Sequence, residues 1–172
     1  MSQTTIQSGE QTDTSLSAHV REEIDHWRQR FPAEQSRSAI IGALHAAQHE
    51  NHGYLTQSLM DAVADYLGLE PIKVYEIATF YSMFETKPVG RHNVAICTNV
   101  SCMLRGAEDL VAHAEQSLGI KLGESTADGR IYLKREEECL AACCGAPMMM
   151  VDHVYHENLT PESMQKLLDE LD

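Results

Sequence analysis

Apolar residues recur at every third or fourth position through the first half of the chain, which is the spacing of one face of a helix. The first run of such positions comprises Val20, Ile24, Trp27 and Phe31. Ser17 precedes this run as a helix-capping residue, and Pro32 ends it. The pattern therefore predicts a first helix between these two residues.

Three further segments with the same period follow. The second helix is expected over about residues 36–51, the third over 56–68 and the fourth over 71–84. The residues expected to face their common core are Ile40, Ile41, Leu44, Ala47, Leu59, Val63, Leu67, Val74, Ile77, Ala78 and Tyr81. Four short amphipathic helices joined by tight turns predict a small helical bundle over residues 16–85.

The hydrophobic period changes after residues 85–90, a segment of charge, proline and glycine that is typical of a linker. Strands are expected at 92–97, 129–134, 148–151 and 154–156, with helices at 106–119 and 161–171. The first strand–helix–strand unit implies parallel pairing, whereas the turn at Asp152 and His153 implies an antiparallel hairpin. Residues 86–172 are thus predicted to form a small mixed sheet with helices against it. The fold class of the whole chain is α+β.

Composition narrows the choice of partners and compartment. Hydrophobic residues make up 43% of the 172 residues, which is enough for a core, whereas residues 1–15 are polar and are predicted to be a disordered tail. The formal net charge of −13 opposes binding to nucleic acid. We recognise no secretory signal and no membrane-spanning run, so we expect no direct membrane insertion. The five cysteines then belong to a reducing compartment, where metal binding is commoner than disulfide formation.

Four of these cysteines form two closely spaced pairs. Cys97 and Cys102 are separated by four residues, and Cys139 and Cys143 by three. Two such loops can each hold one iron of a [2Fe-2S] cluster, which needs four thiolates. The spacing differs from the C-x-x-C pairs of zinc ribbons and dithiol oxidoreductases, although a zinc-stabilised interaction domain stays an alternative.

The segments CTNVSCMLRG and CLAACCGAPMMMVD resemble the cluster motifs of the E subunit of NADH-quinone oxidoreductase, respiratory complex I. The resemblance covers nearly everything after the first fifteen or so residues. It implies one [2Fe-2S] cluster on a thioredoxin-like domain, with Cys97, Cys102, Cys139 and Cys143 at the ligand positions. Cys144 departs from the family pattern. We expect it to point into the domain core, because neighbouring residues of an extended segment face opposite sides.

The family resemblance also implies the partners. In the family, FMN and NADH bind a companion flavin subunit, and both subunits belong to the soluble arm of the complex. This chain would then be cytoplasmic, in the peripheral arm of an inner-membrane complex. The chain itself contains no recognised dinucleotide fingerprint, P-loop or nucleophile elbow, which favours an electron carrier over a substrate-binding subunit. The equivalent diaphorase subunit of an NAD-linked hydrogenase or formate dehydrogenase is the alternative within the family.

Other residues invite competing interpretations. Residues 36–84 could be a helix-turn-helix module, but the last helix offers only Lys73 as a basic residue. His45, His49 and His52 could suggest a metal, yet no fourth ligand accompanies them, so surface histidines are favoured. Arg105 is expected either to turn towards the cluster or to lie in solvent. Gly106 and Gly145 would let the backbone approach the cluster closely.

Overall fold

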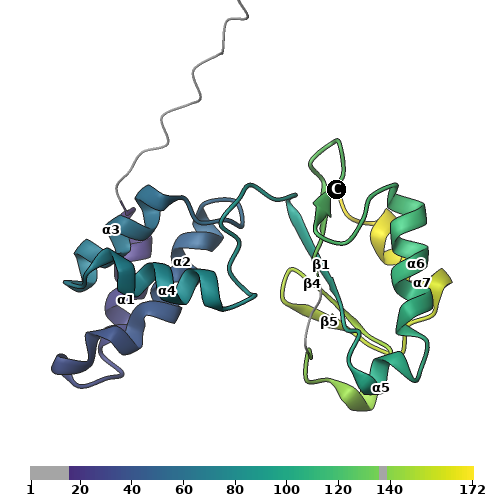
Figure 1. The fold of residues 1–172 in the computed structure, drawn as a ribbon, viewed down its shortest axis with the longest axis horizontal. Coiled ribbons are helices and arrows are strands. Elements are labelled where there is room, and N and C mark those ends of the chain that lie inside the picture. The colour runs from purple at the N-terminus through teal and green to yellow at the C-terminus, as the bar shows by residue number, and fades with distance from the viewer. Residues whose placement is uncertain (1–15, 136–138) are drawn as a thin grey trace, which may run out of the picture.

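The computed structural model describes residues 16–135 and 139–172. The predicted tail over residues 1–15 lies outside the described residues. Figure 1 shows the helices of the first half on one side of a connecting segment and a sheet with its own helices on the other. Within the described ranges, no helix is both long and apolar enough to cross a bilayer.

The first half forms the predicted bundle. Its helices are α1 (Ala18–Arg28), α2 (Ile40–Glu50), α3 (Gln57–Leu67) and α4 (Pro71–Phe80), with a 3-10 segment, η1 (Ala33–Ala39), before α2. The predicted caps are present, because the hydroxyl of Ser17 accepts the N–H of Val20 at 3.1 Å and that of Thr56 accepts the N–H of Leu59 at 3.1 Å. Gly68 ends α3 in the left-handed conformation.

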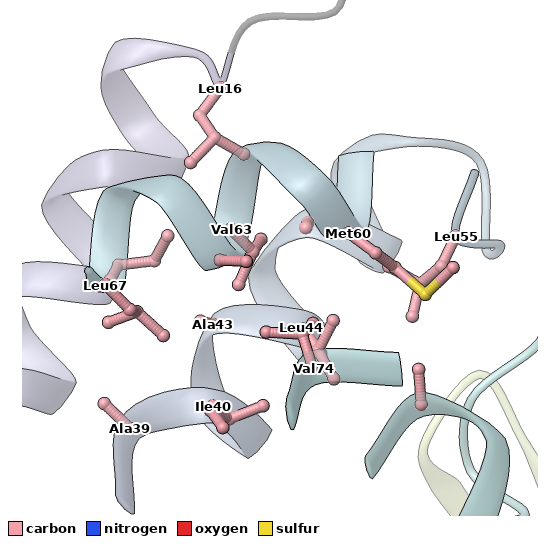
Figure 2. Packing of buried hydrophobic residues seen from close by; sticks show 14 of the residues in the cluster. Leu16, Ala39, Ile40, Ala43, Leu44, Leu55, Met60, Val63, Leu67 and Val74 are labelled. Atoms are coloured by element: carbon pink, nitrogen blue, oxygen red, sulfur yellow. The ribbon is translucent and has the colours of Figure 1, made fainter. Parts of the chain in front are cut away.

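One apolar core lies between these helices. Leu44, Val63 and Val74 come from α2, α3 and α4 and are fully buried there. Figure 2 shows their side chains directed into the space that the helices share. Burial of such side chains, rather than helix propensity, supplies most of the stability of helices of this length.

Two boundaries and two core assignments differ from the prediction. Helix α2 begins at Ile40 rather than near residue 36, because the residues before it up to Ala39 belong to the 3-10 segment η1. Of the neighbours Ile40 and Ile41, only Ile40 lies on the inner face of α2, and Ile41 is 36% exposed. Helix α4 ends at Phe80 rather than near residue 84. Tyr81 is extended and 37% exposed, because it stands beyond the last helical turn.

The second half is a five-stranded mixed sheet. Its strands are β1 (His92–Ile96), β2 (Glu124–Ser125), β3 (Ile131–Leu133), β4 (Met149–Val151) and β5 (Val154–His156), in the spatial order β2-β3-β1-β4-β5. Strands β1 and β3 are parallel and β4 and β5 antiparallel, as the connections predicted. The pairs β1–β4 and β2–β3 are also antiparallel. Asp152 and His153 form the hairpin turn with φ of 48° and 70°. The two-residue strand β2 was not predicted, since so short a segment has no hydrophobic period.

The helices of this half are α5 (Val100–Met103), α6 (Ala107–Leu118) and α7 (Pro161–Asp169), with a 3-10 turn, η2 (Cys143–Gly145). Figure 1 shows α6 and α7 together on one side of the sheet. Side chains alternate along β1, so that Val94 and Ile96 join the core beneath these helices. Ala95 and Cys97 join a smaller buried cluster instead. The alternation thus places Cys97 away from the main core.

Glu85 connects the two halves through both backbone and side chain. On the bundle side, its carbonyl accepts the N–H of Leu55 at 2.7 Å and its N–H donates to Gln48 at 2.8 Å. On the sheet side, its carboxylate accepts the hydroxyl of Tyr132 at 3.3 Å and lies 3.7 Å from the ammonium of Lys134. The Lys134 side chain is only 7% exposed, so this ion pair is largely removed from water.

Candidate metal centre

The first cysteine pair, Cys97 and Cys102, is buried. Strand β1 delivers Cys97, whose N–H bonds the carbonyl of Met148 at 3.1 Å. Asn99 caps the short helix α5 by accepting the N–H of Val100 at 2.8 Å, and Cys102 lies within that helix. Cys97 is 2% exposed and Cys102 1% exposed. Both thiols are therefore shielded from bulk water.

The second cysteine pair, Cys139 and Cys143, lies at the protein surface. The sulfur atoms of Cys139 and Cys143 are 3.9 Å apart, and both residues are exposed. The N–H of Ala141, a residue with φ of 60°, donates to the sulfur of Cys139 at 3.3 Å. This N–H lowers the pKa of Cys139, but the neighbouring thiol of Cys143 and partial desolvation outweigh it and leave that pKa raised.

The two pairs meet. Burial acts to raise the pKa of Cys97, whereas the neighbouring thiols of Cys102 and Cys139 are among the groups that lower it. Cys102 in turn experiences the charge of Cys143. Thiols from two segments that lie about forty residues apart along the chain thus influence one another's ionisation.

Electrostatics at the inner pair favour one thiolate. Burial acts to raise the pKa of Cys97, but backbone hydrogen bonds to Leu140 and Asn99, together with the neighbouring thiols, bring it below its ordinary value. Burial and the adjacent Cys97 raise the pKa of Cys102 to about 11. Clustered thiols cannot all ionise unless cations compensate their mutual repulsion. Four thiolates at this site would therefore need the compensating cations that a metal centre supplies.

The donor set fits a two-iron cluster. Four thiols supply two ligands to each iron, which is the all-cysteine arrangement of [2Fe-2S] proteins. Within residues 16–135 and 139–172, no three His, Cys, Asp or Glu side chains are grouped so as to hold a single metal ion. That finding is compatible with a cluster, because each of its irons takes only two protein ligands.

The expectation for Cys144 is wrong: Cys144 is exposed rather than turned into the core. Alternation requires an extended segment, but residues 143–145 form the 3-10 turn η2, in which neighbours do not alternate between two sides. Gly145 is the residue of this turn that is buried. No interaction joins the sulfur of Cys144 to another cysteine among the described residues.

Among the described residues, the side chains of the remaining candidates make no hydrogen bond with a cysteine sulfur. Arg105 is exposed, and its guanidinium makes no hydrogen bond or ion pair with the described residues. His49 and His52 are exposed, as expected for surface histidines, whereas His45 is half-buried. The His45 ring lies 3.1 Å from the sulfur of Met83, and desolvation lowers its pKa.

Sequence reasoning missed two contributors to the site. The backbone of Leu140 is one of the groups that lower the pKa of Cys97. No local sequence pattern predicts this contact, because the two residues are far apart in the sequence. Glu157 lies against Gly145, and only the glycine itself hinted at such a close approach.

A mixed sheet that carries two cysteine loops, one after β1 and one before β4, defines the class of thioredoxin-like iron–sulfur proteins. The chain belongs to the family of thioredoxin-like [2Fe-2S] ferredoxins, whose family model matches residues 24–172.

Relatives at higher identity have names that are more specific. The NADH-quinone oxidoreductase E subunit 2 of Rhizobium meliloti (strain 1021) is 47% identical over 150 residues, which is 87% of this chain and 87% of that protein. The NADH-quinone oxidoreductase E subunit of Rickettsia felis is 43% identical over 141 residues, covering 82% of this chain and 84% of the relative. The mitochondrial NADH dehydrogenase [ubiquinone] flavoprotein 2 of Dictyostelium discoideum is 39% identical and matches 83% of this chain and 57% of its own length.

Among solved structures, an NAD+-reducing [NiFe]-hydrogenase in the air-oxidised state is similar in fold, with a TM-score of 0.63 and 22% identity. The match covers 74% of this chain but only 22% of the hydrogenase chain. At this identity the likeness shows the fold alone.

Proposed function

We propose that this chain is the electron-transfer subunit of the NADH dehydrogenase module of an NADH-quinone oxidoreductase, and that it holds one [2Fe-2S] cluster. The observation that carries the proposal is the group of four thiols from Cys97, Cys102, Cys139 and Cys143 on this fold. The names of relatives at 39–47% identity over more than four-fifths of the chain support it.

Each cysteine pair has a distinct part in this proposal. Cys97 and Cys102 would bind one iron on the buried side and exclude water from it. Cys139 and Cys143 would bind the other iron on the exposed side. Backbone N–H groups such as that of Ala141 point at sulfur and would offset the negative charge there. When bound, the cluster supplies one-electron transfer. The exposed pair is where an electron would enter or leave.

The partner in this proposal is the flavin subunit that binds FMN and NADH, together with other subunits of the soluble arm. The location that follows is the cytoplasmic, peripheral arm of an inner-membrane complex. The equivalent diaphorase subunit of an NAD-linked hydrogenase is the second candidate, and the fold likeness to an NAD+-reducing hydrogenase is compatible with both candidates.

We also propose that residues 16–85 and 86–172 are two folding units, with docking as the role of the first. Their buried residues form separate clusters, one ending at Phe84 and the others beginning at Val94. Limited proteolysis of the full chain should then cut first within residues 86–90. Early cleavage inside α1–α4 or the sheet would argue against these boundaries.

The chemical test is cluster analysis of the purified chain. We expect two irons and two acid-labile sulfides per chain, and a rhombic electron paramagnetic resonance signal after reduction. One zinc with no sulfide would contradict the proposal. All-cysteine ligation also predicts a low potential, on the order of −400 mV.

The ligand assignment is tested with adjacent variants. Cys143→Ser should lose the cluster or change its spectrum, whereas Cys144→Ser serves as the matched control and should keep both cluster content and spectrum. Cys144 could replace the missing ligand in Cys143→Ser and give a cluster with an altered spectrum. That altered spectrum should vanish when Cys143→Ser and Cys144→Ser are combined. A native spectrum for Cys143→Ser and cluster loss in Cys144→Ser would reverse the assignment.

A further inference from the structure

A carboxylate lies directly against the second cysteine loop. A Cβ placed on Gly145 would stand 2.6 Å from both Cβ and Cγ of Glu157, and closer still to its Cδ. The side chain of Glu157 therefore occupies the space that any other residue at position 145 would fill. Gly145 has no positive φ, so close approach rather than backbone conformation requires the glycine here.

Backbone hydrogen bonds made by the two residues after Glu157 hold this arrangement. The N–H of Asn158 donates to the carbonyl of Gly145 at 2.6 Å, and the N–H of Leu159 donates to that of Pro147 at 2.9 Å. These bonds tie the segment after β5 to the segment that carries Cys143. The position of Glu157 is thus set by the backbone that follows it, and not by its own rotamer alone.

The Glu157 carboxylate has no structural task that accounts for this placement. Over the described parts of the chain it makes no hydrogen bond and no ion pair. Gly145 is two residues beyond Cys143 in the single turn η2, and a 3-10 helix rises only about 2 Å per residue. The Glu157 side chain consequently lies against the same short turn that carries Cys143, whose thiol we assign to the exposed iron.

We propose that Glu157 lowers the reduction potential of the cluster by holding its carboxylate against the ligand loop, an inference that rests on the proposed function above. Reduction adds one electron to a centre whose four thiolates already make it anionic, and the potential of such a centre depends on nearby charge and solvent exposure. A neighbouring carboxylate repels the added electron. Gly145 serves this effect by leaving room for the carboxylate.

The test is the midpoint potential of the full-length, cluster-loaded chain, measured by redox titration with electron paramagnetic resonance detection. Glu157→Gln keeps the shape and removes the charge. We expect its equilibrium constant for reduction to rise about threefold to tenfold, where tenfold is 59 mV for one electron. The difference should shrink between about 0.05 M and about 1 M salt, because an exposed charge is screened.

Two control variants separate charge near the loop from other effects. Glu157→Asp retains the carboxylate and should stay within about twofold of the wild-type constant. Glu22→Gln removes one exposed acid from α1, in the helical bundle, and should also leave the constant within about twofold. A shift by Glu22→Gln as large as that of Glu157→Gln would overturn the proposal, since net charge alone would then explain the effect.

Gly145→Ala tests the close approach itself. The added methyl group must displace the carboxylate, so the potential should rise as it does in Glu157→Gln. In the Glu157→Gln background, Gly145→Ala should raise the potential by less than it does in the wild-type chain, because the two changes act on one interaction. Equal, additive shifts would show that Gly145→Ala acts through the loop and not through the carboxylate.

Cluster content distinguishes the failure of this proposal from the failure of the proposed function. Full iron and sulfide with identical potentials in wild type and Glu157→Gln would overturn the role of Glu157 and leave the electron-transfer function standing. A wild-type chain without iron and sulfide would overturn both.

Discussion

The ion pair between Lys134 and Glu85 joins the sheet to the end of the bundle, and its removal should loosen that junction. The Lys134 side chain is 7% exposed and that of Glu85 17% exposed. Lys134→Met keeps the length of the side chain and removes its charge, which leaves the Glu85 carboxylate with less compensation in a largely dry environment. Breaking a buried ion pair in this way costs about 3–5 kcal/mol in general.

We expect a smaller cost here, about 2 kcal/mol, because the pair is loose and retains a second donor. The Nζ–Oε1 distance is 3.7 Å, and the hydroxyl of Tyr132 also donates to the carboxylate at 3.3 Å. Glu85→Gln in the Lys134→Met background should recover part of the loss, with a coupling energy of about 1 kcal/mol.

Amide hydrogen exchange of the full chain measures this change locally. The N–H of Leu55 is bonded to the carbonyl of Glu85, and the N–H of Glu85 is bonded to Gln48. A loss of about 2 kcal/mol should make both amides exchange roughly 30-fold faster, since each 1.4 kcal/mol is a factor of ten.

Lys73→Met is the matched control. Lys73 pairs with Glu76 at 3.3 Å on the surface of α4, where both side chains are more than 40% exposed. Loss of an exposed pair should cost about 0.5 kcal/mol or less. The reasoning is refuted if Lys134→Met changes the exchange of Leu55 and Glu85 less than about threefold, or no more than Lys73→Met does.

Two further variants test packing and pH dependence. Gly42→Ala would place Cβ 2.5 Å from Cδ1 of Trp27, so overpacking of about 1–3 kcal/mol should exceed a helix-propensity gain of about 1 kcal/mol and lower the urea midpoint followed by fluorescence of Trp27. A midpoint that rises would refute this. The hydrogen bond to Asp152 raises the pKa of His92 above its usual 6.5. The stability that His92 contributes is therefore fully present below about pH 6.5 and is lost as pH rises through the folded pKa. Urea midpoints of wild type and His92→Gln should accordingly differ most at about pH 6 and least at about pH 9. A gap that widens with pH would contradict the assignment.

Local features of the chain were predictable from the sequence. Ser17 and Thr56 cap their helices as expected, because capping involves groups only three residues apart. Strand β1 places Cys97 directly after its last residue, which follows from the alternation of Val94 and Ile96. The spacing of the cysteines, with the family resemblance, sufficed to select four of the five as candidates.

The tertiary structure decided what depends on residues distant in sequence. Cys144 points outward because η2 replaces the expected extended segment, and that turn forms where the chain packs against the segment after β5. Glu85 acquires Lys134 and Tyr132 only once the sheet has formed beside the bundle. The contact between Glu157 and Gly145 likewise forms only when segments distant in the sequence pack together. Periodicity and capping are set by neighbours a few residues away, whereas these contacts join positions at least twelve residues apart, and only packing of the whole chain brings such positions together.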